Sequence, residues 1–293
     1  MSENYERYYV PAQSHWPIVG AIGLFCIAFG AGGYVNDVAK GVSGFSGYLL
    51  LAGIAIIIYM MVGWFKNVID ESMSGMYSAQ MDRSFRQGMS WFIFSEVMFF
   101  AAFFGALLYA RVFAVPWLGG ASNNAMTHEV LWPTFEAIWP LTKTPSGVVT
   151  EAMGWNGLPL YNTIILLISS VTLHFAHTGL EQEKRGQLKW LLGITILLGV
   201  IFLFLQAEEY IHAYQEMGLM LTSGIYGNTF FLLTGFHGLH VTLGTIMLIV
   251  MFFRIVMKDH FTPANHFGFQ ATSWYWHFVD VVWVMLFIFV YVL

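Results

Sequence analysis

Long apolar stretches constrain this chain more than any other feature of its sequence. A helix needs about 20 mostly apolar residues to cross the hydrocarbon core of a bilayer. Seven stretches approach or exceed that length, and short polar segments separate most of them. We therefore predict an all-α, polytopic membrane protein with seven transmembrane helices. The predicted helices cover residues 17–34, 45–65, 88–110, 158–180, 190–207, 229–253 and 273–293.

The composition excludes several other classes of protein. Apolar residues make up 57% of the 293 residues and charged residues only 10%, whereas about a quarter of a soluble domain is charged. So little charge cannot cover so much apolar side chain in water, which excludes an ordinary soluble enzyme and a disordered chain. The net charge of −5 offers no basic surface for nucleic acid. Because Cys26 is the one cysteine, an internal disulfide, an iron–sulfur cluster and a dinuclear copper centre are also excluded.

The lysines and arginines predict the orientation of the helices, because basic residues concentrate in cytoplasmic segments. Nine of them fall on the side of the N-terminus and three on the opposite side. We therefore expect the N-terminus in the cytoplasm and the C-terminus outside. The first group is Arg7, Lys66, Arg83, Arg86, Lys184, Arg185, Lys189, Arg254 and Lys258, and the second is Lys40, Arg111 and Lys143.

We expect a single membrane domain over residues 1–293, with helices 1–2 at about 17–65 and helices 3–7 at about 88–293. One connection, at about 111–157, is much longer than the others and is rich in tryptophan and proline. Tryptophan prefers the headgroup level of a membrane, so we predict that this segment caps the outer surface; a docking surface for a partner is the alternative. Glu208, Glu209 and Glu216 fit a second outer loop, after the fifth helix.

Glu96 lies near the middle of the third apolar stretch. A charged group at the centre of a membrane helix costs about 2.5–3.5 kcal/mol on insertion scales, so we expect a protonated carboxyl there unless a cation is near. Two interpretations stay open. Glu96 is either a proton-relay or regulatory carboxyl, or a neutral acid that hydrogen-bonds between helices.

Three pairs of polar residues lie within the predicted helices at a spacing of three, which places both side chains of a pair on one helical face. Such pairs could bind a metal or heme, hydrogen-bond across helices, or face a wet interface. Because the chain lacks a carboxylate-and-histidine set of the di-iron type, we predict no metal ligand. The pairs are His174 with His177, His237 with His240, and His277 with Asp280, of which the last most simply pair with each other or with a neighbouring helix.

Several sequence motifs occur in order along nearly the whole chain. They are Trp16-Pro17, Asp70-Glu71-Ser72, FSEVMFF at 94–100, LQAEEY at 205–210, GIYG at 224–227 with Phe230, GFHGLHV at 235–241, HFGF at 266–269 and WYWHFVDVVW at 274–283. Together these motifs resemble one family, subunit III of heme–copper cytochrome c oxidase, and their number and order make the resemblance specific.

The resemblance implies an accessory subunit of a proton-pumping oxidase in a bacterial-type inner membrane. The hemes and the active-site copper would lie in the catalytic subunit I, and a copper-containing subunit II would receive electrons from cytochrome c. This chain would carry no redox centre, no catalytic residue and no cofactor except bound phospholipids. Its first two helices would be splayed from a bundle of five, with lipid in the cleft. It would sustain proton uptake by subunit I and protect it from inactivation during turnover.

The resemblance also implies roles for individual residues. Glu96 matches an intramembrane carboxylate of the family that reacts with hydrophobic carbodiimides. Glu71, Arg86 and Arg254 resemble lipid-cleft and headgroup contacts, and pairing of arginine with phosphate fits that role. The alternative is that these arginines reflect only the positive-inside pattern. His237, His240, His277 and Asp280 would be polar contacts between helices.

Two other functions remain as hypotheses from the residues alone. Glu96, the histidine pairs and Asp280 are compatible with an independent membrane carrier or channel. The histidine pairs are also compatible with a membrane metalloenzyme. The carrier predicts transport by the isolated chain in liposomes, and the metalloenzyme predicts stoichiometric metal in the isolated chain. The oxidase subunit predicts neither.

Overall fold

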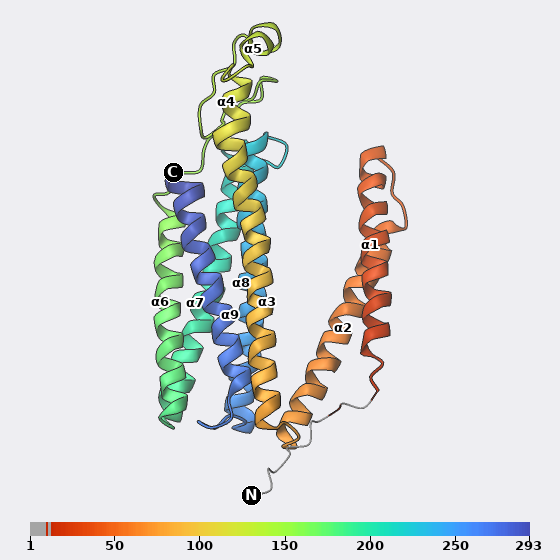
Figure 1. Ribbon diagram of the computed structural model, residues 1–293, viewed down its shortest axis with the longest axis vertical. Helices are drawn as coiled ribbons and strands as arrows, with labels where there is room; N and C mark the ends of the chain where they lie inside the picture. The colour runs from red at the N-terminus through yellow and green to blue at the C-terminus, as the bar shows by residue number, and fades with distance from the viewer. Residues whose placement is uncertain (1–9, 11–12) are drawn as a thin grey trace, which may run out of the picture. The chain divides into compact units, whose positions relative to one another are not determined.

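The computed structural model describes residue 10 and residues 13–293, so Arg7 of the basic count lies outside the described residues. The described part is helical, with two isolated β-bridges and no named strand (Figure 1). Its elements are α1 (Trp16–Lys40), α2 (Ser46–Met73), α3 (Ala79–Tyr109), η1 (Ala110–Ala114), α4 (Val115–Leu118), α5 (Ala125–Leu131), α6 (Leu158–Glu181), α7 (Arg185–Gln215), α8 (Ile225–Lys258), α9 (Phe267–Leu286) and η2 (Phe287–Val292).

The predicted membrane helices are confirmed. Among the described residues, seven helical segments are long and apolar enough to cross a bilayer, and each contains one predicted stretch or all but one terminal residue of it. Several helices extend beyond the apolar stretch at one or both ends. Local signals explain some of these ends: Pro17 and Pro159 lie in first turns, where a missing N–H costs nothing, and Gly41 ends α1 with a φ of 66°.

The chain divides into two compact units, Met1–Phe85 and Arg86–Leu293, and the boundary lies within α3. We describe each unit by itself. The boundary falls between the two groups of helices that the sequence separates at about 65 and 88. The predicted splay of the first group and the assignment of one membrane domain stay predictions.

In the N-terminal unit, α1 and α2 form a hairpin whose helices approach closely through glycines. A Cβ on Gly30 would lie 2.4 Å from the backbone nitrogen of Leu50, and a Cβ on Gly53 would lie 2.7 Å from the backbone nitrogen of Ile27. Small residues allow this close approach. They are common between membrane helices, because the hydrophobic effect does not drive helices together in lipid. Most other side chains of the hairpin are exposed.

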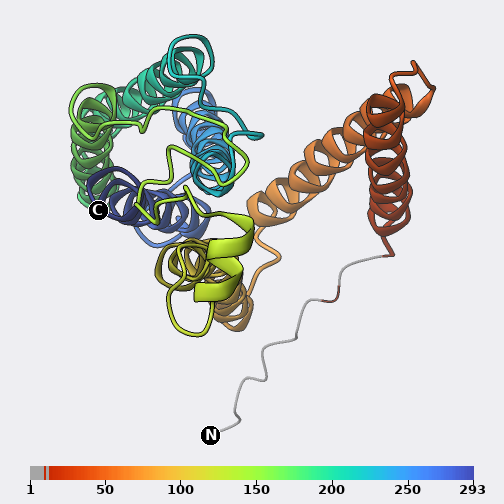
Figure 2. The same cartoon turned by 90° about the horizontal axis from the view of Figure 1, so that it is seen from above.

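In the C-terminal unit, α6, α7, α8 and α9 form a ring in which each helix packs against two others (Figure 2). Two tryptophans of α9 fill its interior. Trp276 donates its indole N–H to the Ser169 hydroxyl at 3.0 Å, and it lies where a Cβ on Gly199 of α7 or Gly244 of α8 would be. Two helical turns later, Trp283 donates to the Thr163 hydroxyl at 2.9 Å. Each indole therefore joins α9 to its neighbours.

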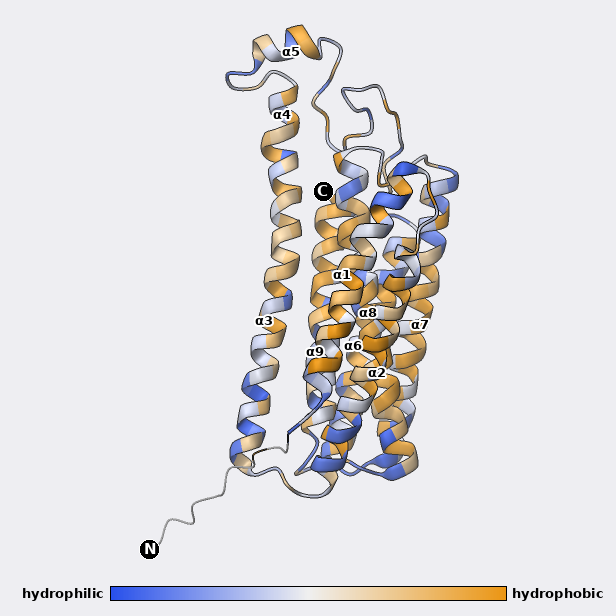
Figure 3. Ribbon diagram, turned by 90° about the vertical axis from the view of Figure 1, so that its right-hand side faces the viewer, coloured by the Kyte–Doolittle hydropathy of each residue, from blue (hydrophilic) through white to orange (hydrophobic). Residues whose placement is uncertain are grey.

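The C-terminal part of α3 packs against α8 and α9 through aromatic rings. Phe99 meets Phe236 of α8 with 5.0 Å between ring centroids, and Phe100 meets Phe278 of α9 at 6.1 Å. Hydrophobic residues dominate the middle of the long helices, and hydrophilic residues gather near their ends (Figure 3).

The long connection begins later than predicted. Helical structure continues past Arg111 through a π-helical segment and α4 to Leu118. The predicted connection includes Pro116. A proline usually stops a helix, but this one lies in the first turn of α4 directly after the π-helix, where it is tolerated. The segment then returns to the end of the ring, where the Thr150 hydroxyl donates to the Met217 carbonyl at 3.1 Å and the Met153 N–H donates to the Tyr226 hydroxyl at 3.0 Å.

The loop predicted after the fifth helix also begins later. α7 continues to Gln215, so Glu208 and Glu209 belong to the helix, and only Glu216 follows it. Glu209 is fully buried. The predicted helix ends at Ala207 because polar residues follow it. Glu209 and Ala213 nevertheless lie on the buried face of α7, so the helix continues.

Candidate functional site

The carboxyl of Glu96 on α3 contacts the imidazole of His240 on α8. Glu96 Oε2 lies 3.0 Å from His240 Nε2, and the other ring nitrogen, Nδ1, lies 2.6 Å from the Phe236 carbonyl. Because a carbonyl only accepts, Nδ1 carries a proton. One further proton is then shared between Nε2 and the carboxyl: either a neutral acid donates to a neutral imidazole, or an imidazolium donates to a carboxylate.

The surroundings of this pair are apolar. The ring of His240 lies 5.0 Å from that of Phe100 and 6.3 Å from that of Tyr275, measured between centroids. Only 23% of the Glu96 side chain and 10% of the His240 side chain are exposed. Both protonation arrangements leave the pair with no net charge, which suits a position where an isolated charge is costly.

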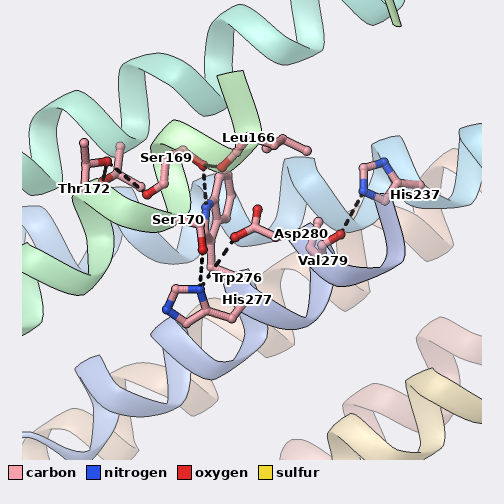
Figure 4. Close-up of polar contacts among 10 residues, drawn as sticks. Leu166, Ser169, Ser170, Thr172, His237, Trp276, His277, Val279 and Asp280 are labelled. Carbon is pink, nitrogen blue, oxygen red and sulfur yellow. Dashed lines mark hydrogen bonds and ion pairs between the residues drawn. The ribbon is translucent and has the colours of Figure 1, made fainter. Parts of the chain in front are cut away.

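His237 lies only three residues before His240 but belongs to different surroundings. It is fully buried, its Nε2 lies 3.2 Å from the Val279 carbonyl (Figure 4), and its ring packs 4.9 Å from that of Trp283. His237 therefore faces the interior of the ring, whereas His240 faces α3. The structure does not bring the two imidazoles together as ligands of one ion.

His277 and Asp280 of α9 lie together with Ser170 of α6 (Figure 4). His277 Nδ1 is 2.8 Å from the Ser170 hydroxyl and 3.6 Å from Asp280 Oδ2. The first contact is a hydrogen bond, and the second has ion-pair distance when the imidazole is charged. The group therefore joins α9 to α6 beside the indole of Trp276.

The sequence analysis missed the serine and threonine hydroxyls of α6 that lie near this group and form hydrogen bonds between helices. Ser169 accepts from Trp276 and donates to the Leu166 carbonyl at 2.7 Å. The Thr172 hydroxyl lies 2.8 Å from that of Thr195 on α7. Serine and threonine are so common in membrane helices that no signal in the sequence singles these out.

Three arginines contact the connection between α8 and α9 or the first residues of α9. Arg86 of α3 donates to Gln270, and its guanidinium lies 5.1 Å from the centre of the Phe267 ring. Arg254 of α8 stacks on Phe261 at 4.4 Å. Arg185 of α7 donates to the Phe261 carbonyl at 2.5 Å. The basic ends of three helices thus meet the same segment, and guanidinium groups there could bind phosphate.

His260 completes the surroundings of Arg254. Burial and the nearby cations of Arg254 and Lys258 lower the pKa of His260. The imidazole is therefore neutral at pH 7, and its Nδ1 can accept from Arg254 Nε at 3.4 Å. The neutral ring adds no positive charge that would attract an anion, and it occupies one donor of the guanidinium.

Glu71 lies in the N-terminal unit at the end of α2. Its carboxylate accepts from the Tyr77 hydroxyl at 2.8 Å, and that hydroxyl also lies 3.3 Å from the Val68 carbonyl. Tyr77 therefore fixes the carboxylate against the turn between α2 and α3. Arg86 and Arg254 belong to the C-terminal unit.

The sequence analysis also missed a buried polar group around Glu209. Gln206 Nε2 lies 3.4 Å from Glu209 Oε2, and both side chains are buried. Glu208, Glu209 and His212 help to line a cavity of about 320 Å³ that also meets Met153 and Met217. The spacing of Gln206, Glu209 and Ala213 on one helical face was the available signal.

Comparison with known proteins extends over nearly the whole chain. The family model for cytochrome c oxidase subunit III matches residues 6–293. The chain is 37% identical over 294 residues to cytochrome c oxidase subunit 3 of Tragelaphus oryx, covering 99% of this chain and 98% of the relative. It is also 37% identical over 292 residues to the protein of the same name from Bos mutus grunniens, covering 99% of each. The protein of that name from Hippopotamus amphibius is 37% identical over 293 residues and matches 99% of this chain and 98% of its own length.

Proposed function

This chain belongs to the cytochrome c oxidase subunit III family, and from that premise we propose that it supports proton uptake, lipid binding and stability in a proton-pumping oxidase. As a member of the family it is a non-catalytic subunit of the terminal oxidase, in which other subunits hold the heme and copper. Its proposed partners are the catalytic subunit I, which reduces oxygen to water, the copper-containing subunit II and, through the complex, cytochrome c.

The observation that carries the proposed role in proton uptake is the contact between Glu96 and His240. An acid and an imidazole that share one proton in apolar surroundings can exchange it without leaving an isolated charge. In this family other subunits hold the heme and copper, so we propose that the pair acts by supporting the catalytic subunit. We assign Glu96 a proton-related role and assign no catalytic residue.

The proposed lipid binding is supported by the exposed apolar surface and by the arginines at its end. Phe204 of α7 is 73% exposed and Trp190 is 78% exposed, which requires a cover of lipid or partner subunits. At the end of α8, the half-buried Arg254 is held by its stacking on Phe261. A guanidinium fixed in this way can bind a phospholipid phosphate with little loss of side-chain entropy. Arg86 and Glu71 are the other proposed headgroup contacts.

We further propose a bacterial-type inner membrane with the N-terminus in the cytoplasm. Arg185 and Arg254 contact Phe261 in the connection before α9, and Arg86 contacts Gln270 near the start of α9. These contacts support the assignment of the three helix ends to a single side. Alkaline phosphatase fused after Gln215 should be active, and the same enzyme fused after Lys258 should be inactive. The reverse pattern would refute the orientation.

The proposed function is tested by removing this chain from the purified oxidase and adding it back. The depleted complex should keep its heme spectrum but take up protons more slowly and lose activity during turnover. Addition of the chain with phospholipid should restore both properties. Loss of heme with the chain would contradict a non-catalytic role, and unchanged proton uptake and inactivation would contradict the supporting role.

A further inference from the structure

The end of α6 and the connection between α8 and α9 bring together two histidines and a glutamate. His177 and Glu181 lie one helical turn apart on α6, and His266 directly precedes α9. The potential ligand atoms of the three side chains all lie within 4.8 Å of one another. This group is separate from Glu96 and from the arginines discussed above, and no step of the proposed function uses it.

We propose that His177, Glu181 and His266 form a binding site for a divalent transition-metal ion, with Zn²⁺ as the best fit. Two imidazoles and a carboxylate suit zinc, whereas Mg²⁺ and Ca²⁺ prefer an all-oxygen set. Three protein ligands would leave one position of a tetrahedral ion open to water. The sequence analysis predicted no metal ligand, and it did not consider His266, which comes from another segment than His177 and Glu181.

The two imidazoles have nitrogen atoms suited to binding. His266 Nδ1 lies 3.1 Å from the Thr262 carbonyl, so this nitrogen carries the proton and the lone pair is on Nε2. A carbonyl partner of this kind commonly fixes the tautomer of a metal-binding histidine. His177 Nε2 is buried and has no hydrogen-bond partner among the described residues. A buried nitrogen without such a partner is unfavourable until a ligand satisfies it.

The distances require only small side-chain movements. His177 Nε2 lies 3.8 Å from Glu181 Oε1, and the rings of His177 and His266 lie 5.3 Å apart at 71°. Ligand bonds of about 2.1 Å place the ligands of a tetrahedral zinc ion about 3.4 Å from one another. The side chain of Glu181 is 56% exposed, so it is free to change rotamer and opens the site to ions from water.

The backbone around the site is braced before any ion binds. Thr262 and Asn265 form an antiparallel bridge that holds the segment before His266. Arg185, at the start of α7, contacts Asp259 at 3.2 Å and the Phe261 carbonyl. The turn that follows Glu181 is thereby tied to the connection that carries His266. Such preorganisation favours binding, since less conformational freedom is lost when the ion arrives.

Zinc binding by the complete purified oxidase tests this site. After chelator treatment, equilibrium dialysis with radioactive Zn²⁺ should show one ion fewer per complex in His266→Gln and in Glu181→Gln than in the unmodified protein. His174→Gln and Glu183→Gln are matched controls, because they remove an imidazole and a carboxylate beside the site and should keep the ion. Glu181→Gln changes an exposed side chain, so it remains informative if His266→Gln fails to assemble.

A second measurement locates the ion. Anomalous scattering at the zinc absorption edge, from crystals of the oxidase, should show a peak between the end of α6 and His266 in the unmodified protein and no such peak in Glu181→Gln. Equal zinc content in all five proteins would overturn the proposal. Equal losses in the controls and in the site variants would also overturn it, because the three named side chains would then have no special role.

Discussion

At the residue scale, Glu96 shows how a costly group is accommodated. Its carboxyl shares one proton with the imidazole of His240, so the pair as a whole carries no net charge. The sequence predicts that the Glu96 carboxyl is protonated or lies near a cation, because Glu96 lies in an apolar stretch. The sequence did not identify His240 as the partner, because the contact between the two side chains depends on how α3 packs against α8.

We expect Glu96→Gln to leave assembly and heme content intact and to change oxidase turnover modestly. A glutamine amide can still donate a hydrogen bond to His240 Nε2, but it has no titratable proton. Turnover should therefore fall by much less than the ~10²-fold typical for the loss of a general acid or base. The measurement is oxygen consumption per heme in the purified complex.

Glu96→Leu is the matched control, because it leaves His240 Nε2 without a partner. Such a loss costs about 1–3 kcal/mol for a buried group, so the thermal midpoint of the complex should fall more than in Glu96→Gln. A complete failure of Glu96→Gln to assemble would show that the carboxyl is structurally essential and would contradict this account.

Arg254 gives a second prediction at the residue scale. We expect Arg254→Ala to reduce bound phospholipid more than it reduces stability, since stacking on Phe261 contributes only about 0.5–2 kcal/mol. Lys258→Ala is the control, because it removes an exposed cation one turn later. Native mass spectrometry of the complex measures the retained lipid. Unchanged lipid content in Arg254→Ala would count against a headgroup site.

At the scale of elements, the ring of four helices depends on glycines that admit Trp276. A Cβ on Gly199 would lie 2.7 Å from the indole and 2.9 Å from the Thr245 hydroxyl oxygen. We expect Gly199→Ala to destabilise the C-terminal unit by about 1–3 kcal/mol, the usual cost of overpacking. The thermal midpoint of the purified complex checks this.

Gly193→Ala is the matched control on the same helix. A Cβ there would meet Phe252 at 3.8 Å, which is an ordinary contact. The control should keep the original midpoint. Equal midpoints for Gly199→Ala and Gly193→Ala would mean that Trp276 moves aside easily, against the packing described for the ring.

The hairpin of the N-terminal unit gives the corresponding prediction for α1 and α2. Gly30→Ala would place a methyl group against the backbone of Leu50, whereas Gly32 has no such neighbour within 4 Å among the described residues. We expect faster amide hydrogen exchange over Trp16–Met73 in Gly30→Ala than in Gly32→Ala, because the helices would separate slightly. Equal exchange rates in the two variants would contradict close helix packing at Gly30.

The sequence predicts the helices well because apolar length is a strong signal. It predicts their ends less well. Polar residues after Ala207 looked like a loop, but Glu209 continues α7 into the ring. The connection was predicted to begin at about residue 111, but a π-helix and α4 continue the helical structure to Leu118. In both cases the packing of distant segments decides the end, and a local pattern does not contain that information.

The same limit applies to the candidate sites. A spacing of three placed His237 and His240 on one face, yet the structure turns one toward the ring interior and the other toward α3. His277 and Asp280 do lie together, because both belong to one helix and their separation is local. Ser170 and His266 could not be assigned to their groups from the sequence, since both meet their partners across separate helices.

At the scale of the whole molecule, the helices and the family match lead to the same conclusion. Seven described helices are long and apolar enough to cross a membrane, and the family match over residues 6–293 confirms the resemblance that the motifs suggested. The exposed aromatic and aliphatic side chains on both units need lipid or partner subunits around them. The central claim is therefore that this chain functions inside an oxidase complex.

The most direct test is purification through a tag on this chain in mild detergent, followed by a reduced-minus-oxidised optical spectrum and identification of the subunits that copurify. We predict heme bands together with two larger subunits that carry the redox centres. A colourless preparation of this chain alone, from an extract that contains a functional oxidase, would contradict the account.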